Sequence, residues 1–337
     1  MIDLLIAGGG PAGLAAAIRA AALGMEAVVV EPRTAPIDKA CGEGIMPSGV
    51  AALRALGVEV PGRPLRGIRY VAGARRAEAA FRGRPGLGVR RTALHSALHA
   101  RALELGVRIV PGKVTEVRQS DDRIEACGLT ARWLIAADGL HSPVRRGLGL
   151  DGPGSAVRRY GQRRHYRIAP WTEFVEVHWS RHGEAYVTPL ADGLVGVAVL
   201  SGERLAYESQ LAAFPRLAAG LLGRDAGPVR GAGPLRRRAR TQRAGRVLLV
   251  GDAAGYVDAL TGEGVALAVA TAGAAVDSLA AGRPQDYPDR WARVTRRHRL
   301  LTCGLLSLAR RPATARLIVP VAHRAPALFG AAVRALQ

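Results

Sequence analysis

Residues 3–13 read DLLIAGGGPAG, an apolar run that leads directly into a cluster of glycines. An alanine-rich segment follows as far as residue 24, and a second apolar run, AVVV at residues 27–30, ends at Glu31. This order predicts a strand, a tight turn, a helix and a second strand. The acid at the end of the second strand completes the pattern of a dinucleotide-binding βαβ unit.

The three glycines Gly8, Gly10 and Gly13 match the spacing G-x-G-x-x-G. In such a turn the first glycine permits the tight bend, the second lets a pyrophosphate approach the backbone, and the third lets the helix pack closely on the strand. The helix N-terminus behind them favours phosphate, and Glu31 can accept hydrogen bonds from ribose hydroxyls. A glycine turn in an ordinary βαβ unit is the alternative, since the chain holds 42 glycines.

The composition of the 337 residues bounds the class of protein. The length suffices for two domains or one elaborated domain. No run of about 18 residues lacks a charged or polar break, and no secretory signal precedes the first strand, so we expect neither a transmembrane helix nor export. Cys41, Cys127 and Cys303 are widely spaced and odd in number, which predicts neither a disulfide framework nor a metal site. We expect a protein of the reducing cytoplasm.

The net charge of +21 comes almost entirely from arginine, because Lys39 and Lys113 are the only lysines. A GC-rich genome produces the same excess of arginine, alanine and glycine. A functional alternative is the attraction of an anionic substrate, an acidic carrier protein or a membrane surface. Nucleic acid is disfavoured, because the arginines are scattered and aromatic residues make up only 4% of the chain.

The rest of the chain alternates between helical and strand patterns. We expect helices at residues 49–56, 91–98, 206–222 and 265–280, and two or three arginine-bearing apolar helices from about residue 291. Strands are expected at residues 67–72, 76–81, 107–111, 134–137, 163–168, 174–179, 184–188, 194–200 and 246–250, with a hairpin formed by residues 114–119 and 123–127. The long loop at residues 32–47 is expected to be functional.

These patterns predict an α/β fold with a Rossmann-like nucleotide-binding domain, an inserted and mostly antiparallel substrate domain, and C-terminal helices. The nucleotide-binding domain is predicted to be discontinuous, at residues 1–65, 88–150 and 239–290. The substrate domain is predicted at residues 66–87 and 151–238, and the helical segment at residues 291–337.

Three motifs stand in one order along the chain: the glycine turn with Glu31, the run ADGLHSPVR at residues 137–145, and GDAA at residues 251–254. Together they resemble the single-component flavoprotein hydroxylases of the para-hydroxybenzoate hydroxylase fold and the related geranylgeranyl reductase-like branch. The resemblance covers most of the chain and implies FAD as cofactor. FAD is too long for one βαβ unit, so its flavin half needs a second site far along the chain, where a Gly-Asp turn meets a helix N-terminus.

The resemblance assigns candidate roles to single residues. Asp252 would contact the ribityl chain, Thr261 to Gly264 would wrap the flavin edge, and Arg91 would contact the pyrophosphate, with Arg90 as a close rival. Asp138 either contacts the cofactors as part of the second motif, at residues 137–145, or caps the next helix. The cofactor-binding residues predicted in this way are Gly8, Gly10, Pro11, Ala12, Gly13, Glu31, Arg33, Cys41, Gly42, Arg91, Val114, Asp138, Gly139, Gly251, Asp252, Gly262, Glu263 and Gly264.

No catalytic residue follows directly from the sequence, and Cys41, His165 and Tyr186 are the candidates. The loop KACGEG at residues 39–44 is similar to the K-x-C-G-G-G loop of the reductase-like branch, with Glu43 in place of a glycine. Cys41 is either a reactive thiol or a small packed residue. His165 is either a general acid or base or a solvated side chain, as are His178 and His182. The stretch AYVTP, which contains Tyr186, only partly matches that branch's aromatic substrate motif.

We therefore expect an FAD-dependent oxidoreductase that NADH or NADPH reduces transiently. The leading expectation is a monooxygenase that hydroxylates a small organic substrate, aromatic or polyketide-like, through a flavin hydroperoxide. Such a substrate is anionic or carrier-bound if the arginine excess steers it. The alternatives are reduction of carbon–carbon double bonds, as in the geranylgeranyl reductase-like branch, and a non-catalytic flavin-binding sensor.

Overall fold

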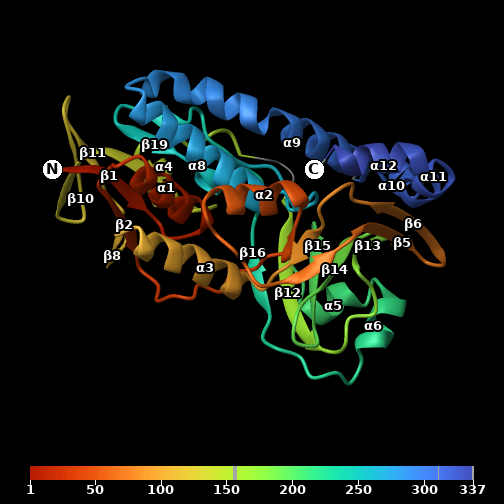
Figure 1. Cartoon of the computed structure of the whole chain (residues 1–337). Helices are drawn as coiled ribbons and strands as arrows, with labels where there is room; N and C mark the ends of the chain where they lie inside the picture. Colours follow the sequence, from red (N-terminus) through yellow and green to blue (C-terminus); the bar gives the residue numbers. More distant parts are fainter. Residues whose placement is uncertain (155–157, 310, 336–337) are drawn as a thin grey trace.

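Two large β-sheets lie side by side in the computed structural model, which describes residues 1–154, 158–309 and 311–335 (Figure 1). The first sheet has eight strands, with β18-β19-β11-β1-β2-β8 in order and β10 and β9 continuing from β11. The neighbouring pairs β19–β11, β11–β1, β1–β2 and β2–β8 are all parallel. This sheet and its helices confirm the predicted Rossmann-like α/β fold.

The N-terminal elements of the first sheet follow the predicted order: β1 (Ile2–Ala7), α1 (Pro11–Ala22), β2 (Ala27–Glu31), α3 (Arg91–Glu104) and β8 (Arg108–Pro111). Its remaining members are β9 (Arg118–Gln119), β10 (Ile124–Ala126), β11 (Leu129–Ala136), β18 (Arg243–Ala244) and β19 (Val247–Leu249). The hairpin expected near residues 114–127 is the antiparallel pair β9–β10. Helix α8 (Gly264–Ala280) packs along α1, and α4 (Pro143–Gly147) and α7 (Gly251–Ala254) follow β11 and β19.

The turn between β1 and α1 depends on two close contacts. Gly8 adopts φ +104°, and a Cβ there would lie 2.7 Å from the carbonyl oxygen of Ala137. A Cβ on Gly13 would overlap the carbonyl oxygen of Gly8. Glycine is therefore required at both positions, and α1 can approach β1 closely enough to direct its N-terminus past the strand end.

The second sheet has seven strands in the order β16-β12-β15-β14-β13-β5-β6. Its pairings are antiparallel except for β13 with β5, so the predicted antiparallel layer is present. The strands are β5 (Gly67–Ala72), β6 (Arg75–Ala80), β12 (Tyr160–Arg167), β13 (Phe174–Ser180), β14 (Gly183–Pro189), β15 (Leu194–Ser201) and β16 (Arg230–Ala232).

The single helix expected at residues 206–222 is instead two short helices, α5 (Tyr207–Leu211) and α6 (Pro215–Leu221). Pro215 is the cause, because proline has no N–H to continue a helix and fits only its first turn. Two small sheets were not expected from the sequence. One contains β3 (Gly44–Ile45), β4 (Arg63–Leu65) and β7 (Gly86–Gly88), and the other pairs β17 (Arg237–Arg238) with β20 (Gly255–Tyr256).

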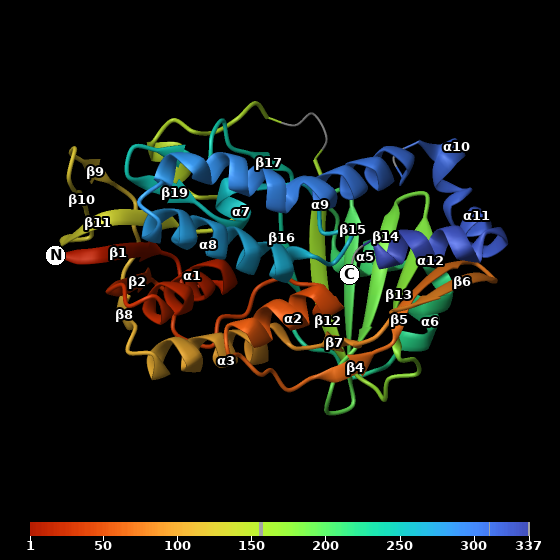
Figure 2. The same ribbon diagram turned by 45° about the horizontal axis from the view of Figure 1, so that its top comes forward.

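Helices α2 (Pro47–Ala55) and α9 (Tyr287–Ala309) complete the body, with a short 3-10 turn at Pro284–Asp286 ahead of α9. Helix α9 runs past both sheets, and α10 (Pro312–Ala315), α11 (Ile318–Arg324) and α12 (Pro326–Arg334) follow it over the second sheet (Figure 2). The last two pack against β6. Among the helices of the described residues, none is long and apolar enough to cross a bilayer.

Gly13→Ala tests the contact that seats α1 on β1. Alanine is the better helix former, so any loss of stability reports the clash with the Gly8 carbonyl oxygen. We expect the free energy of unfolding to fall by roughly 2–3 kcal/mol, measured by denaturation of the cofactor-free protein. Gly10→Ala is the matched control, because its Cβ would meet nothing within 4 Å. Equal stability of the two variants would contradict the close packing.

Candidate functional site

One cavity of about 490 Å³ extends from the carboxyl ends of β1 and β2 to the face of the second sheet. Its walls include the glycine turn, the loop at residues 39–44, the loop at residues 256–264 and the strands β5, β13, β14 and β15. The first part is rich in backbone and charged groups, whereas the second is mostly apolar. We call these the polar half and the apolar half of the cavity.

The N-terminus of α1 faces the polar half of the cavity. Gly10 is its N-cap residue, no side chain caps the helix, and its first turn holds no acid. The Cβ position of Gly10 is open, so the backbone is bare toward the cavity. An uncapped helix N-terminus is an anion site, because its N–H groups and the helix dipole both favour negative charge.

Glu31 lies at the side of this turn and is almost fully buried. Its Oε2 accepts a hydrogen bond from the N–H of Gly9 at 2.8 Å, and its Oε1 accepts from Nε of Arg33 at 2.7 Å. Burial raises the pKa of Glu31, but the hydrogen bonds from Arg33 and Gly9 more than offset it, so the pKa lies below the usual value for glutamate. Glu31 therefore carries a negative charge that braces the glycine turn.

Arg91 begins α3 and is buried, whereas its neighbour Arg90 is exposed. The Nη1 atom of Arg91 is buried without a hydrogen-bond partner among the described residues. Arg91 lines the cavity and Arg90 does not. A buried guanidinium nitrogen that lacks a partner is costly, so its position at the wall indicates an anionic ligand. Between the two rivals, the geometry favours Arg91.

A second helix N-terminus, that of α8, opens into the same polar half. Its N-cap is Glu263, no side-chain hydrogen bond caps it, and its first turn holds no acid. Asp252 of the Gly-Asp turn lines the cavity nearby, with Nζ of Lys39 at 3.9 Å from its carboxylate. The carboxylate of Glu263 contacts Nδ1 of His298 at 2.8 Å, which ties the loop to α9. His298 also lines the cavity.

The carboxylate of Asp138 contacts the backbone at the start of α4, the helix that follows it. Its Oδ2 accepts a hydrogen bond from the N–H of Val144 at 3.1 Å, in the first turn of α4, whose N-cap residue is Ser142. Oδ1 is buried without a hydrogen-bond partner among the described residues, and Asp138 lines the cavity. The two interpretations of Asp138 are therefore compatible. Arg145 of the same motif is buried and donates to the carbonyl oxygens of Ala253 and Leu140, which joins the second and third motifs.

The loop at residues 39–44 is fixed to the second sheet by buried charges. Glu43 adopts φ +59°, a conformation that favours glycine, and its Oε2 lies 2.6 Å from Nε2 of His165. Its Oε1 accepts from the N–H of Arg91 at 2.8 Å. Arg163, also on β12, contacts His165 and forms an ion pair with Asp38. The acid at the position of the reductase-like branch's glycine thus holds the loop in place.

Cys41 and His165 differ in their access to the cavity. Cys41 lines it, and burial raises the pKa of its thiol, which disfavours a reactive thiolate. His165 is buried against Glu43 and Arg163, and it is absent from the cavity wall. The geometry gives His165 a bracing role.

The apolar half of the cavity is walled by strands of the second sheet. Its side chains come from β5, β13, β14 and β15 and the segment before β17, and they are Ile68, Tyr70, Val175, Val177, Tyr186, Ala198, Leu200 and Leu235. The hydroxyl of Tyr186 donates to the carbonyl oxygen of Leu260 at 3.0 Å, so its ring is fixed at the junction of the two halves. This lining suits an apolar ligand.

Asp258 adds one ionisable group at this junction. It is buried, lines the cavity, and lies 3.0 Å from Nε of Arg159, whose Nη2 contacts Glu184 at 2.6 Å. Burial raises the pKa of both carboxyl groups, and the attraction of Arg159 offsets this only in part. Of the two acids of this cluster, Asp258 lines the cavity and Glu184 does not.

Of the predicted cofactor residues, all except Gly13 line the cavity, and Gly13 packs on Gly8 beneath it. Of the predicted catalytic candidates, Cys41 and Tyr186 line it. Arg163, Asp258 and His298 also line the cavity but are not predicted from the sequence, because they lie outside its motifs and reach the site only through the fold.

Comparison with known proteins bears on the cofactor. The family model described as an FAD binding domain matches residues 1–163. The chain is 30% identical to the menaquinone reductase of Mycobacterium tuberculosis strain H37Rv, over an alignment of 380 positions that covers 99% of this chain and 90% of the relative. It is 29% identical to digeranylgeranylglycerophospholipid reductase 1 of Methanothermobacter thermautotrophicus, covering 78% of this chain and 73% of the relative.

Solved structures share the fold at lower identity. A flavin-dependent brominase, a triple mutant, superposes with a TM-score of 0.81 at 17% identity and covers all of this chain and 94% of its own. A flavoprotein/dehydrogenase from Cytophaga hutchinsonii superposes with a TM-score of 0.76 at 19% identity, covering 96% of this chain and 92% of its own.

The residues of the polar half fit FAD. Two uncapped helix N-termini and the unpaired Nη1 of Arg91 face one space, as a pyrophosphate requires, and the backbone at Gly10 is bare toward it. Glu31 and Val114 line one part of this space, and Asp252 and Gly262 line another.

Arg91→Met tests the fit to the pyrophosphate. Charge-assisted hydrogen bonds contribute about 1.5–3 kcal/mol, so we expect FAD affinity to fall about tenfold to a hundredfold. Titration of the cofactor-free protein with FAD, followed by flavin fluorescence, measures the change. Arg90→Met is the matched control, because Arg90 is exposed and does not line the cavity. An equal loss in both variants, or none in Arg91→Met, would overturn the assignment.

Proposed function

The chain belongs to the FAD-dependent oxidoreductases of the para-hydroxybenzoate hydroxylase fold, and from this premise we propose that it is a reductase acting on a carbon–carbon double bond of an apolar, isoprenoid-like substrate. The proposal rests on one observation above all. A polar half that fits FAD opens without a break into a half walled by aliphatic and aromatic side chains. A long hydrocarbon chain can enter such a space, where each buried methylene contributes about 0.8 kcal/mol.

The names of the relatives support this substrate class. Two of the relatives that match over at least 70% of their own length are named a menaquinone reductase and a digeranylgeranylglycerophospholipid reductase. The loop at residues 39–44, which resembles the reductase-like branch, lines the cavity between its two halves. We therefore place double-bond reduction ahead of hydroxylation, the reverse of the order that the motifs alone favour.

The reduction adds two electrons and two protons to the double bond. FAD held in the polar half and reduced by NADH or NADPH would supply the two electrons and one of the hydrogens as a hydride. The residues of the chain orient the substrate, exclude water and supply the remaining proton. We assign the proton to Asp258, which lines the cavity and shares one guanidinium with Glu184. Tyr186 would position the double bond, since its ring is held beside Leu260.

Hydroxylation of a small organic substrate is the second candidate. The observation in its favour is that the stretch around Tyr186 departs from the aromatic substrate motif of the reductase-like branch. The two reactions differ in their need for dioxygen, because a hydroxylase inserts one oxygen atom and a double-bond reductase inserts none. A non-catalytic flavin sensor is disfavoured by the connected apolar half of the cavity.

The products formed without and with dioxygen distinguish the two reactions. Under strict anaerobiosis, with a reduced nicotinamide and a short-chain isoprenoid quinone, we expect a product whose quinone form, recovered after any quinol has been reoxidised, is heavier by two hydrogens in its side chain, detected by mass spectrometry. Under labelled dioxygen we expect the same product without label. One labelled oxygen atom in the product and no anaerobic turnover would replace the reductase with the hydroxylase.

Asp258→Asn tests the proton donor. A donor must be protonated, so the rate should fall as pH rises through the raised pKa of Asp258. In Asp258→Asn we expect about a hundredfold slower turnover and loss of this alkaline limb, since general acid catalysis contributes about 10²–10⁴-fold.

Glu184→Gln is the matched control, because Glu184 belongs to the same cluster but does not line the cavity. It removes the neighbouring negative charge, so the alkaline limb should move to lower pH while turnover persists at acidic pH. An Asp258→Asn enzyme that keeps the wild-type pH profile would exclude Asp258 as the donor.

A further inference from the structure

The C-terminal part of the chain has a one-sided charge. The 48 residues after Asp289 contain ten arginines and no aspartate or glutamate. This segment therefore contributes a charge of +10 to the net charge of +21, although it is only a small fraction of the chain. A genome-wide preference for arginine explains added arginines but not a complete lack of acids in one segment.

Helix α9 buries one face against the protein and exposes arginines on the opposite face. The side chains of Trp291, Thr295, His298, Thr302 and Leu306 recur every three or four residues and are buried. The opposite face, at similar spacing, holds the exposed residues Arg293, Arg296, Leu300 and Leu308. It is basic in its first half and apolar in its second half, since Leu300 is 64% exposed and Leu308 49%.

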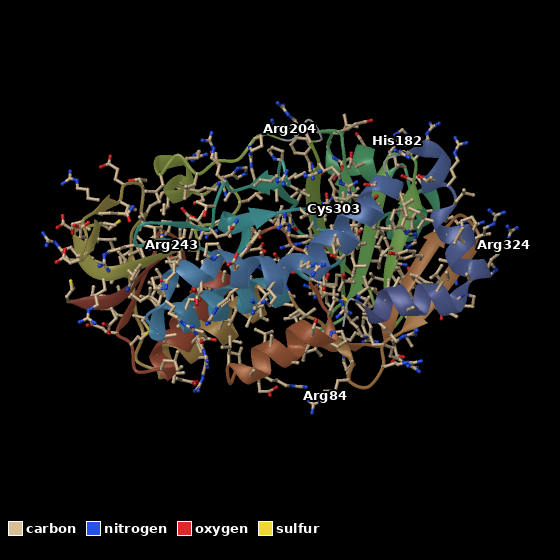
Figure 3. The ribbon with its side chains drawn as sticks, turned by 90° about the horizontal axis from the view of Figure 1, so that it is seen from above. Arg84, His182, Arg204, Arg243, Cys303 and Arg324 are labelled. Atoms are coloured by element: carbon tan, nitrogen blue, oxygen red, sulfur yellow. The ribbon has the colours of Figure 1, made fainter. Side chains whose placement is uncertain are left out.

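The following helices continue the pattern. Leu317, Val321 and Leu328 are exposed by 55%, 48% and 65%, with Arg316 and Arg324 exposed among them. Figure 3 shows Arg324 directed away from the body of the molecule at its end. Among the residues that the structure describes, six of the thirteen large exposed hydrophobic residues lie in this segment. We call the exposed residues Arg293, Arg296, Leu300, Leu308, Arg316, Leu317, Val321, Arg324 and Leu328 the C-terminal face.

The inner side of the same helices reaches the apolar half of the cavity. Phe329 of α12 lies 4.6 Å from the ring centre of Tyr70, a cavity-lining residue. Leu306, Val319 and Phe329 belong to one hydrophobic cluster with Tyr186 and other side chains of the cavity wall. The C-terminal face and the apolar half are thus the two sides of one helical layer.

We propose that the C-terminal face binds the surface of an anionic lipid bilayer. Exposed leucines between arginines match such a surface, because the side chains enter the acyl boundary while the guanidinium groups meet lipid phosphates. Near an anionic leaflet each arginine strengthens binding by about fivefold. A purely polyanionic partner would leave the leucines exposed to water, because it offers no apolar surface to cover them. Binding to a bilayer would bring the enzyme to its substrate, since an isoprenoid-like substrate resides in a bilayer; this link rests on the proposed function.

Binding to vesicles tests the surface without turnover. The full-length, FAD-loaded protein is mixed with vesicles of phosphatidylcholine alone or with a third of phosphatidylglycerol, and the bound fraction is measured by sedimentation. We expect binding to the anionic vesicles that weakens steeply as salt rises, and little binding to the neutral ones.

Two variants divide the surface into its components. Arg293→Gln/Arg296→Gln/Arg316→Gln/Arg324→Gln removes charge, and Leu300→Ser/Leu308→Ser/Leu317→Ser/Leu328→Ser removes apolar area. Each is expected to lower the vesicle partition coefficient by about tenfold or more. The matched controls are Arg84→Gln/Arg204→Gln, at sites marked in Figure 3, and Leu103→Ser/Leu222→Ser, which alter exposed residues outside the C-terminal face. The controls should bind as the wild type does.

Several outcomes would overturn the proposal. Equal binding of the wild type and both C-terminal variants, or equal losses in the controls, would place membrane binding elsewhere. A wild type that ignores anionic vesicles but dissociates from a dimer when the leucines are replaced would make the face a protein interface. Failure of the proposed reductase activity leaves the vesicle result unaffected, so the two hypotheses are tested separately.

Discussion

The close approach of helix α1 to strand β1 is the constraint on which the rest of the molecule depends. Gly13 lies against the carbonyl oxygen of Gly8, and Gly8 lies against Ala137, so three segments meet with no room for a side chain. This contact directs the uncapped N-terminus of α1 into the cavity. Arg145 then joins the second and third motifs, which places the N-terminus of α8 across the same space.

Between these helix ends and the second sheet, contacts between glutamate and histidine side chains hold the loops in place. Glu43 contacts His165 of β12 and the backbone of Arg91, while Glu263 contacts His298 of α9. Removing one partner would leave the other polar group without its hydrogen bond, so these contacts fix the loop positions. The polar half of the cavity is thereby coupled to both the antiparallel sheet and the C-terminal helices.

The sequence predicts the nucleotide-binding part well because its signals are local. The strand, glycine turn and helix at residues 2–22 follow from periodicity and from the spacing of Gly8, Gly10 and Gly13. Long-range features are not predictable in this way. Asp258 and Arg163 belong to no sequence motif. The periodicity of residues 206–222 predicts one helix, although Pro215 separates α5 from α6. The short strands β3, β4 and β7 have too few residues to show a period. The division into domains and the roles of single residues stay predictions.

The most direct measurement is a crystal structure of the protein grown with FAD. We predict the adenine end beside Glu31 and Val114, the pyrophosphate between the N-terminus of α1 and Arg91, and the flavin ring beside Gly262, with the apolar half left for substrate. FAD bound outside this cavity, or a flavin ring that fills the apolar half between Tyr70 and Leu200, would contradict the assignment of one space to cofactor and substrate.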